Sequence, residues 1–186
     1  KYMVPFYAPA SFKVKKALGS LVWDKNNKKY IDFTAGIAVT NLGHSNKTLS
    51  SIIADQSKKV IHLSNLYINE PSINLAKKLC KKTFAEKVFF CNSGAEAVEA
   101  SIKTARKFYS KEKNKNEIIS FSGSFHGRTM MAIALSNNKS LTDGFAPLPK
   151  GIKNHKFNEI KDLEKKFSKN TCAVILELVQ WQSGII

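Results

Sequence analysis

A small polar bend that could bind a ligand follows a short apolar run. Residues 91–101, which contain the bend, read CNSGAEAVEAS. The run from Val88 to Phe90 is β-branched and aromatic and stops at Asn92, which predicts a strand that ends at a turn. From Gly94 onward, apolar residues recur at steps of three and four, which predicts a helix. The bend therefore leads into a helix N-terminus, where free N–H groups and the helix dipole favour an anion.

Two compatible interpretations of this bend stay open. Ser93 and Glu96 have the spacing of a capping box, in which each side chain satisfies a backbone N–H group of the first turn. Gly94 and Ala95 are also small enough to let an anion approach those N–H groups. The Gly-rich motifs that bind triphosphates and dinucleotides do not occur in the sequence, so the bend predicts a site for a single phosphate.

A second loop follows the apolar run EIISF and reads SGSFHGRT over residues 122–129. Phe125 lies outside any apolar period, and it could either stack on a flat ring or plug the loop into the core. His126 could be a general base or a ligand, but we expect a hydrogen-bonded loop residue. Arg128 is one of two arginines in the chain, and its planar fork suits a carboxylate. The other, Arg106, is expected to be an ordinary surface residue.

The elements that must position these residues alternate between strand and helix. Short strands separated by the turn 25–28 predict a hairpin near the N-terminus. Further along, we expect helices over 46–62, 71–82, 94–109, about 130–136 and 158–168, and strands over 88–90, 117–121 and 172–177. This order predicts a mostly parallel, doubly wound α/β sheet. Ligands of such sheets gather at the carboxyl ends of the strands, so the two loops are expected to face one crevice.

Composition narrows the classes of partner. The formal net charge is +16, but scattered lysines supply nearly all of it, so we expect no specific nucleic-acid partner, only non-specific attraction to polyanions. No apolar run has the length of a membrane span, and the N-terminus lacks a signal-peptide pattern, so we expect a cytoplasmic protein without a membrane partner. Three dispersed cysteines predict neither a disulfide framework nor a metal site.

Four segments together resemble the class III, fold type I pyridoxal-phosphate aminotransferases, and most of all the acetylornithine branch of that family. In chain order they read DFTAGIAVTNLGH, HLSNLYINEP, NSGAEAVEASIKTARKFY and SFHGRT. The resemblance implies a fold type I sheet, incomplete in this chain and preceded by a small β/α arm. It divides the chain into an arm over 1–45, part of a small domain, and the first part of a large cofactor-binding domain over 46–186.

The resemblance also implies roles for single residues and for partners. Ser93, Gly94 and Ala95 would bind the phosphate of pyridoxal 5'-phosphate, with Phe125 stacked on its ring. Arg128 would hold the substrate α-carboxylate, and Ile37 would line the substrate pocket. The partners implied are amino-acid and 2-oxo-acid substrates and, in the complete enzyme, a second subunit of a homodimer.

Two motifs of the family are absent from the sequence. The family has a D-E-x-Q motif, whose Asp pairs with the ring nitrogen, and an S-K-x-x-x-G type of motif, whose lysine holds the cofactor covalently. We therefore assign no catalytic residue and expect the 186-residue chain alone to be inactive. Residues 177–184 read ELVQWQSG where relatives read E-P-x-Q-G-E-G-G, so Trp181 replaces a glycine and Gln182 replaces a glutamate that helps to separate ω-amino substrates from glutamate.

The function implied is transfer of an amino group from an ω-amine, such as that of N-acetylornithine, to 2-oxoglutarate in arginine biosynthesis. The ornithine, succinylornithine and 4-aminobutyrate transaminases share these motifs and stay open as alternatives. An alternative of another class is a catalytically silent chain that only binds phosphate compounds or polyanions.

Overall fold

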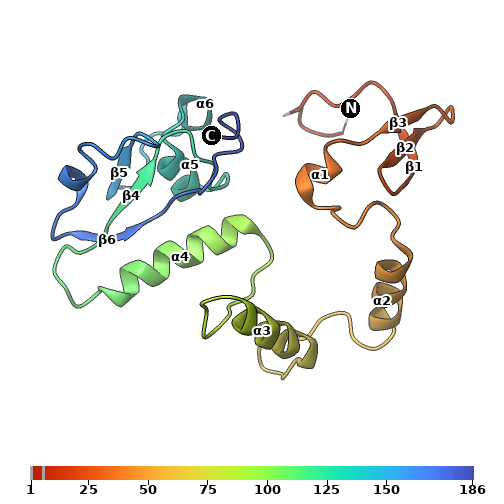
Figure 1. Ribbon diagram of the computed structural model, residues 1–186, viewed down its shortest axis with the longest axis horizontal. Coiled ribbons are helices and arrows are strands. Elements are labelled where there is room, and N and C mark those ends of the chain that lie inside the picture. The colour runs from red at the N-terminus through yellow and green to blue at the C-terminus, as the bar shows by residue number, and fades with distance from the viewer. Residues whose placement is uncertain (1, 6) are drawn as a thin grey trace. The chain divides into compact units, whose positions relative to one another are not determined.

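The computed structural model describes residues 2–5 and 7–186, which form two compact units (Figure 1). The first unit covers Lys1–Lys78 and the second Leu79–Ile186. The expected division into an arm over 1–45 and a larger domain from residue 46 stays a prediction.

An antiparallel sheet forms the start of the first unit. Its strands are β1 (Val14–Leu18), β2 (Leu21–Asp24) and β3 (Lys29–Ile31), paired in chain order. The predicted hairpin between β2 and β3 is confirmed, with Val22 opposite Tyr30. The buried Asp24 carboxylate holds the turn, because it accepts the N–H groups of Asn26 and Lys28 at 2.8 and 2.9 Å.

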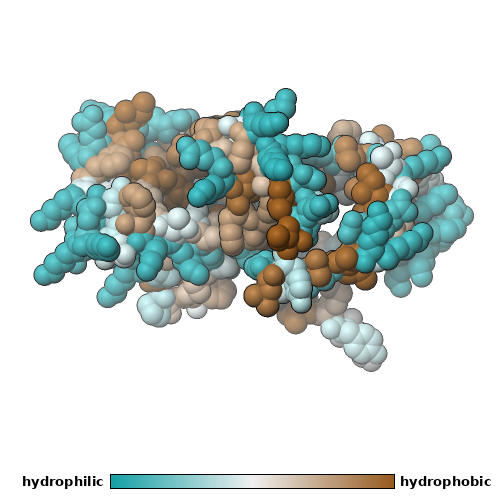
Figure 2. Space-filling model, turned by 90° about the horizontal axis from the view of Figure 1, so that it is seen from below, coloured by the Kyte–Doolittle hydropathy of each residue, from teal (hydrophilic) through white to brown (hydrophobic). Residues whose placement is uncertain are grey.

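Three helices follow β3. The one-turn α1 (Ala35–Ala38) was not expected from the sequence, whereas α3 (Glu70–Lys82) confirms the helix predicted there. The helix predicted over 46–62 is confirmed as α2 (Lys47–Ser57), which ends before residue 62. Asn46 caps α2 by accepting the N–H group of Leu49. Neither α2 nor α3 buries a residue, and their Leu and Ile side chains stay exposed. Figure 2 shows such apolar side chains in brown, exposed among hydrophilic ones.

A parallel sheet is the centre of the second unit and confirms the predicted α/β fold. Its strand order is β5 (Ile152–His155), β4 (Glu117–Phe121), β6 (Thr171–Val174), and both neighbours of β4 run parallel to it. The strand β4 was predicted with these bounds, because its Ile-rich sequence is typical of a strand buried on both faces.

Helices pack against this sheet and complete the core. The long helix α4 (Gly94–Phe108) contacts β6, and α5 (Met130–Ser136) contacts β4 and β5 (Figure 1). One buried cluster joins the three layers through Ile102 of α4, Ile118 of β4 and Leu135 of α5. A short helix, α6 (Lys139–Thr142), follows α5. None of the helices among the described residues has the length and apolar character to cross a membrane.

Two predicted elements are wrong. Residues 88–90 form no strand, because a strand needs a partner for its backbone groups and no described segment pairs with them. Residues 158–168 form turns and a short 3₁₀ helix, η1 (Glu164–Lys166), instead of an α-helix. Asn158 and Asp162 have φ angles of 60° and 71°, which are incompatible with a continuous right-handed helix.

Candidate functional site

The N-terminus of α4 has the capped, accessible form that the sequence predicts. Ser93 is the N-cap, and its hydroxyl oxygen accepts the N–H group of Glu96 at 3.2 Å. A Cβ atom added to Gly94 would meet nothing within 4 Å. The N–H groups of Gly94 and Ala95 lie in the first turn, where helix geometry provides no intrahelical acceptor. This helix end can therefore donate to an anion that approaches beside Gly94.

The carboxylate of Glu96 completes the cap in a modified way. In a capping box it would accept the N–H group of the N-cap residue itself. Here it accepts the N–H group of Asn92 at 2.6 Å, one residue earlier in the chain. Hydrogen bonds from the Asn92 side chain and backbone lower the pKa of Glu96. The carboxylate is thus engaged with Asn92 and leaves the N–H groups of Gly94 and Ala95 free of it.

Gly127 brings the second loop against this helix end. A Cβ atom added to Gly127 would lie 3.4 Å from the Cβ of Ala95 and 3.3 Å from that of Ala132. Its φ angle of +120° is also one that side chains other than glycine rarely adopt. A second contact joins the same elements, since the Thr129 hydroxyl donates to Glu99 of α4 at 2.6 Å. These contacts place the two loops side by side, although one of them follows an extended segment and not a strand. That both loops face one crevice stays a prediction.

Phe125 is half-buried and is fastened through both its backbone and its ring. Its N–H group donates to the Glu177 carboxylate at 2.9 Å. Its ring meets the Trp181 ring edge to face, with centroids 6.0 Å apart. Phe125 contributes no atom to the buried cluster of the second unit, which argues against a core plug. A partly accessible aromatic ring beside a helix N-terminus can stack on a flat ligand that also carries an anion.

His126 departs from the expected hydrogen-bonded loop residue. Its side chain is 7% exposed, and its Nε2 atom has no hydrogen-bond partner among the described residues. Burial lowers the pKa of His126 and the charge of Glu177 opposes this effect, so the neutral imidazole is favoured. An unpaired buried nitrogen is costly, which marks this position as one where a further polar group would stabilise the protein.

The two arginines differ in a way that the sequence does not reveal. Arg128 is exposed and follows Gly127 directly, which leaves its guanidinium accessible to a ligand. Arg106 is not the ordinary surface residue expected, because it donates to the carbonyl oxygens of Asn116 at 3.2 Å and Lys150 at 3.0 Å. Its fork thereby ties the end of α4 to the two segments that lead into β4 and β5.

The C-terminal segment supplies site residues that sequence reasoning missed. Glu177 holds the Phe125 backbone, and the buried Gln180 donates to the Ser122 carbonyl oxygen at 3.2 Å. Ser183 donates to the Gly123 carbonyl oxygen at 2.6 Å. The position of Glu177 in the sequence could have indicated its role. Glu177 ends the apolar run that was predicted as a strand, and ligand sites form beyond the carboxyl ends of parallel strands. Ile37 belongs to the first unit, where it lies in α1 and is exposed.

The family model of class-III aminotransferases matches residues 2–186. The chain belongs to this family. Among similar class III proteins, the acetylornithine/succinyldiaminopimelate aminotransferase of Buchnera aphidicola from Schizaphis graminum is 48% identical over 188 residues. The succinylornithine transaminase of Photorhabdus laumondii is 47% identical over 187 residues. Each alignment covers 100% of this chain and 46% of the relative, so the chain spans about half the length of the class III relatives that it matches.

Solved structures of class III enzymes have the same fold. The ornithine aminotransferase of Toxoplasma gondii aligns with a TM-score of 0.91 and 25% identity over 99% of this chain and 44% of that one. The N-acetylornithine aminotransferase of Stenotrophomonas maltophilia aligns with a TM-score of 0.77 and 35% identity over 96% of this chain and 44% of that one. The fold predicted from the sequence, that of fold type I aminotransferases, is therefore confirmed.

Proposed function

We propose that the full-length polypeptide containing this chain is an aminotransferase that uses pyridoxal 5'-phosphate. The observation that carries the proposal is the close approach of Gly127 to Ala95, because it brings the accessible first turn of α4 beside a loop with a partly accessible aromatic ring. Membership of the class III family supports the same cofactor, which bears one phosphate and one flat ring. A homodimer and a cytoplasmic location are part of this proposal.

The residues present fit this cofactor. Gly94 and Ala95 offer N–H groups and space for the phosphate, with Ser93 next to them. Phe125 offers a ring face, and the buried Nε2 atom of His126 would gain a polar neighbour. When bound, the cofactor supplies an electron sink and a carrier for the amino group. The chain's own residues bind and orient it, because Glu177 fixes the backbone of the loop that carries Phe125.

Arg128 has the role of orienting the substrate in this proposal. An exposed guanidinium on the loop beside Phe125 can bind an α-carboxylate through two parallel hydrogen bonds. The amino donor and the glutamate product each carry a carboxylate that is remote from the reacting carbon, namely the α-carboxylate of the donor and the side-chain carboxylate of glutamate, so one arginine serves both half-reactions. Ile37 is proposed to line the pocket for the remainder of the substrate.

Acylated ornithines are the proposed amino donors. Two relatives at 47–48% identity are named for acetylornithine, succinyldiaminopimelate or succinylornithine, and in all three compounds one amino group carries an acyl group while a second, distant amino group is free. The 2-oxoglutarate acceptor follows from the same family resemblance. Ornithine and 4-aminobutyrate are the competing donors, and a catalytically silent phosphate or polyanion binder is the competing function.

The test compares donors in one assay. Full-length protein with pyridoxal phosphate and 2-oxoglutarate is given N-acetylornithine, succinylornithine, ornithine or 4-aminobutyrate, and glutamate is measured. We expect kcat/KM for the two acylated donors to exceed that for the others by about 10-fold or more, the value of one to two kcal/mol of differential binding. Cofactor binding that collapses between low and moderate salt, without any glutamate, would favour the polyanion binder.

A further inference from the structure

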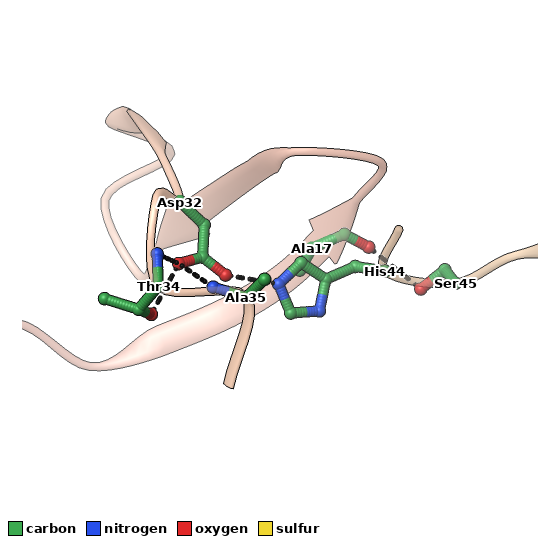
Figure 3. Close-up of polar contacts among 6 residues, drawn as sticks. All are labelled: Ala17, Asp32, Thr34, Ala35, His44 and Ser45. Atoms are coloured by element: carbon green, nitrogen blue, oxygen red, sulfur yellow. Dashed lines mark hydrogen bonds and ion pairs between the residues drawn. The ribbon is translucent and has the colours of Figure 1, made fainter. Parts of the chain in front are cut away.

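An exposed loop of the first unit, residues 33–43, is closed at its base by a hydrogen bond between two side chains. His44 Nε2 and Asp32 Oδ2 lie 2.7 Å apart, although these residues are 12 positions apart in the chain (Figure 3). His44 is also bonded through its backbone to Gly19, in the turn between β1 and β2, by hydrogen bonds of 2.9 and 3.0 Å. The base of the loop is therefore fixed to the sheet on one side and to Asp32 on the other.

Asp32 is also the anchor for the first residues of this loop. Its Oδ1 atom accepts the Thr34 hydroxyl at 2.7 Å and the N–H groups of Thr34 and Ala35 at 2.9 and 3.1 Å (Figure 3). Hydrogen bonds from His44 and then from Thr34 hold the pKa of Asp32 well below its usual range. The carboxylate is thus ionised at working pH and can accept all four hydrogen bonds.

The backbone held by Asp32 is strained. Ala35, Ile37 and Ala38 have φ angles of 46°, 59° and 60°, the left-handed region that residues other than glycine rarely adopt. Such conformations are unfavourable for residues other than glycine and persist only where the surrounding contacts fix them. The hydrogen bonds of Asp32 are contacts of that kind, because they end at Ala35, where the left-handed turn begins.

The loop presents apolar side chains to the outside. Phe33, Ile37 and Val39 are 92%, 74% and 79% exposed, and Leu42 is 69% exposed. A strained, apolar and exposed loop on a well-bonded base is typical of a binding segment and atypical of a connection that serves only the fold.

We propose that Asp32 and His44 are positioning residues that hold loop 33–43 so that Ile37 is presented to the amino donor. This inference rests on the proposed function, in which Ile37 lines the substrate pocket. Neither residue touches the substrate. His44 acts by binding Asp32, and Asp32 acts by holding the amides of Thr34 and Ala35 at the start of the left-handed turn.

The test uses three variants of the full-length protein. His44→Leu removes the donor, whereas His44→Gln places an amide N–H group near the position of Nε2 and keeps the hydrogen bond. Ser45→Ala is the matched control, because its hydroxyl bonds the Ala17 carbonyl oxygen at 2.9 Å beside the same loop base without touching Asp32 (Figure 3). The readouts are KM and kcat for the amino donor, and hydrogen exchange of the 33–43 segment in cofactor-free protein.

We expect His44→Leu to raise the KM for the donor about 10- to 100-fold, the equivalent of one charge-assisted hydrogen bond, with kcat within about 2-fold. Exchange of the 33–43 amides should accelerate at least about 10-fold in the same variant. His44→Gln and Ser45→Ala should leave both readouts near the wild-type values.

Several outcomes would overturn the positioning role. These are unchanged loop exchange in His44→Leu, faster exchange without a change in KM, and an equal rise in KM in Ser45→Ala. If wild-type protein forms no glutamate with any donor, the proposed function itself fails and the positioning role fails with it. A wild-type enzyme that works, with a His44→Leu variant of normal KM, removes only the further inference.

Discussion

At the scale of single residues, the Phe125→Ala variant tests whether the Phe125 ring binds a ligand or packs in the core. A core plug would lose about 3–5 kcal/mol of unfolding free energy on truncation to alanine. Phe125 is half-buried and lies outside the buried cluster of its unit, so we expect Phe125→Ala to lose clearly less than that in cofactor-free protein. Retention of pyridoxal phosphate should fall about 10-fold or more, measured by equilibrium dialysis. A full core-sized loss of stability in thermal unfolding would contradict the stacking role.

Arg128 and Arg106 form a natural matched pair, because they are the only arginines of the chain. Arg128→Lys keeps the charge and loses the fork, so kcat/KM should fall about 10- to 100-fold for the amino donor and for glutamate alike. Arg106→Lys should instead lower stability with little effect on kcat/KM, because Arg106 binds two backbone carbonyl oxygens away from the loop. Unchanged kinetics in Arg128→Lys would remove this arginine from the substrate site.

The lowered pKa of the buried His126 imidazole predicts how the unfolding free energy depends on pH. Its folded pKa lies below the ordinary value of 6.5, so the unfolded chain takes up the proton first as the pH falls. The unfolding free energy should therefore be highest above pH 6.5 and decrease as the pH falls from 6.5 toward the folded pKa. His126→Asn cannot titrate there, so denaturant unfolding of this variant between pH 5 and 8 should show a flatter profile over about that range. Parallel profiles for the two proteins would show that His126 does not govern this dependence.

At the scale of elements, the two glycines beside Ala95 should respond differently to the same change. Gly127→Ala would place a Cβ 3.4 Å from that of Ala95 on a strained backbone, so it should cost about 1–3 kcal/mol of stability. Gly94→Ala meets no atom within 4 Å and lies in the first turn of α4, so stability should stay unchanged or rise by up to about 1 kcal/mol.

The affinity of the Gly94→Ala variant for pyridoxal phosphate then tests where the phosphate binds. If the phosphate lies beside Gly94, an added methyl group should weaken cofactor binding about 10-fold even though the fold is undisturbed. Isothermal titration of Gly94→Ala and of the wild-type protein with pyridoxal phosphate measures this effect. Wild-type affinity in Gly94→Ala would place the phosphate elsewhere.

The elements also show what a sequence can and cannot predict. Helix α4 and strand β4 were predictable because their apolar periods and the Ser93 cap are local signals. Residues 88–90 have strand composition, but a strand depends on a partner, which the local sequence does not specify. Strand β5 was missed because its sequence IKNH has little apolar character and is held by pairing with β4. Glu177 was missed because its partner, the Phe125 N–H group, is 52 residues away.

At the scale of the whole molecule, the net charge of +16 makes the mode of anion binding testable. Scattered lysines attract polyanions through counterion release, so heparin affinity should fall steeply as salt rises from about 50 to 200 mM. A phosphate held by the first turn of α4 and by ring stacking on Phe125 depends less on long-range charge, so pyridoxal phosphate affinity should change only a few-fold over that range. Equal salt slopes for the two ligands, measured by fluorescence titration, would indicate one non-specific mode of binding.

In the proposed function, the helix N-terminus at Gly94 and the loop at Phe125 together hold pyridoxal phosphate. A crystal structure of the full-length protein with this cofactor is the decisive test. We expect phosphate oxygens within about 3 Å of the Gly94 and Ala95 nitrogen atoms, and a pyridine ring stacked on Phe125. A phosphate bound by surface lysines, or a Phe125 ring that contacts Trp181 but not the cofactor, would contradict it.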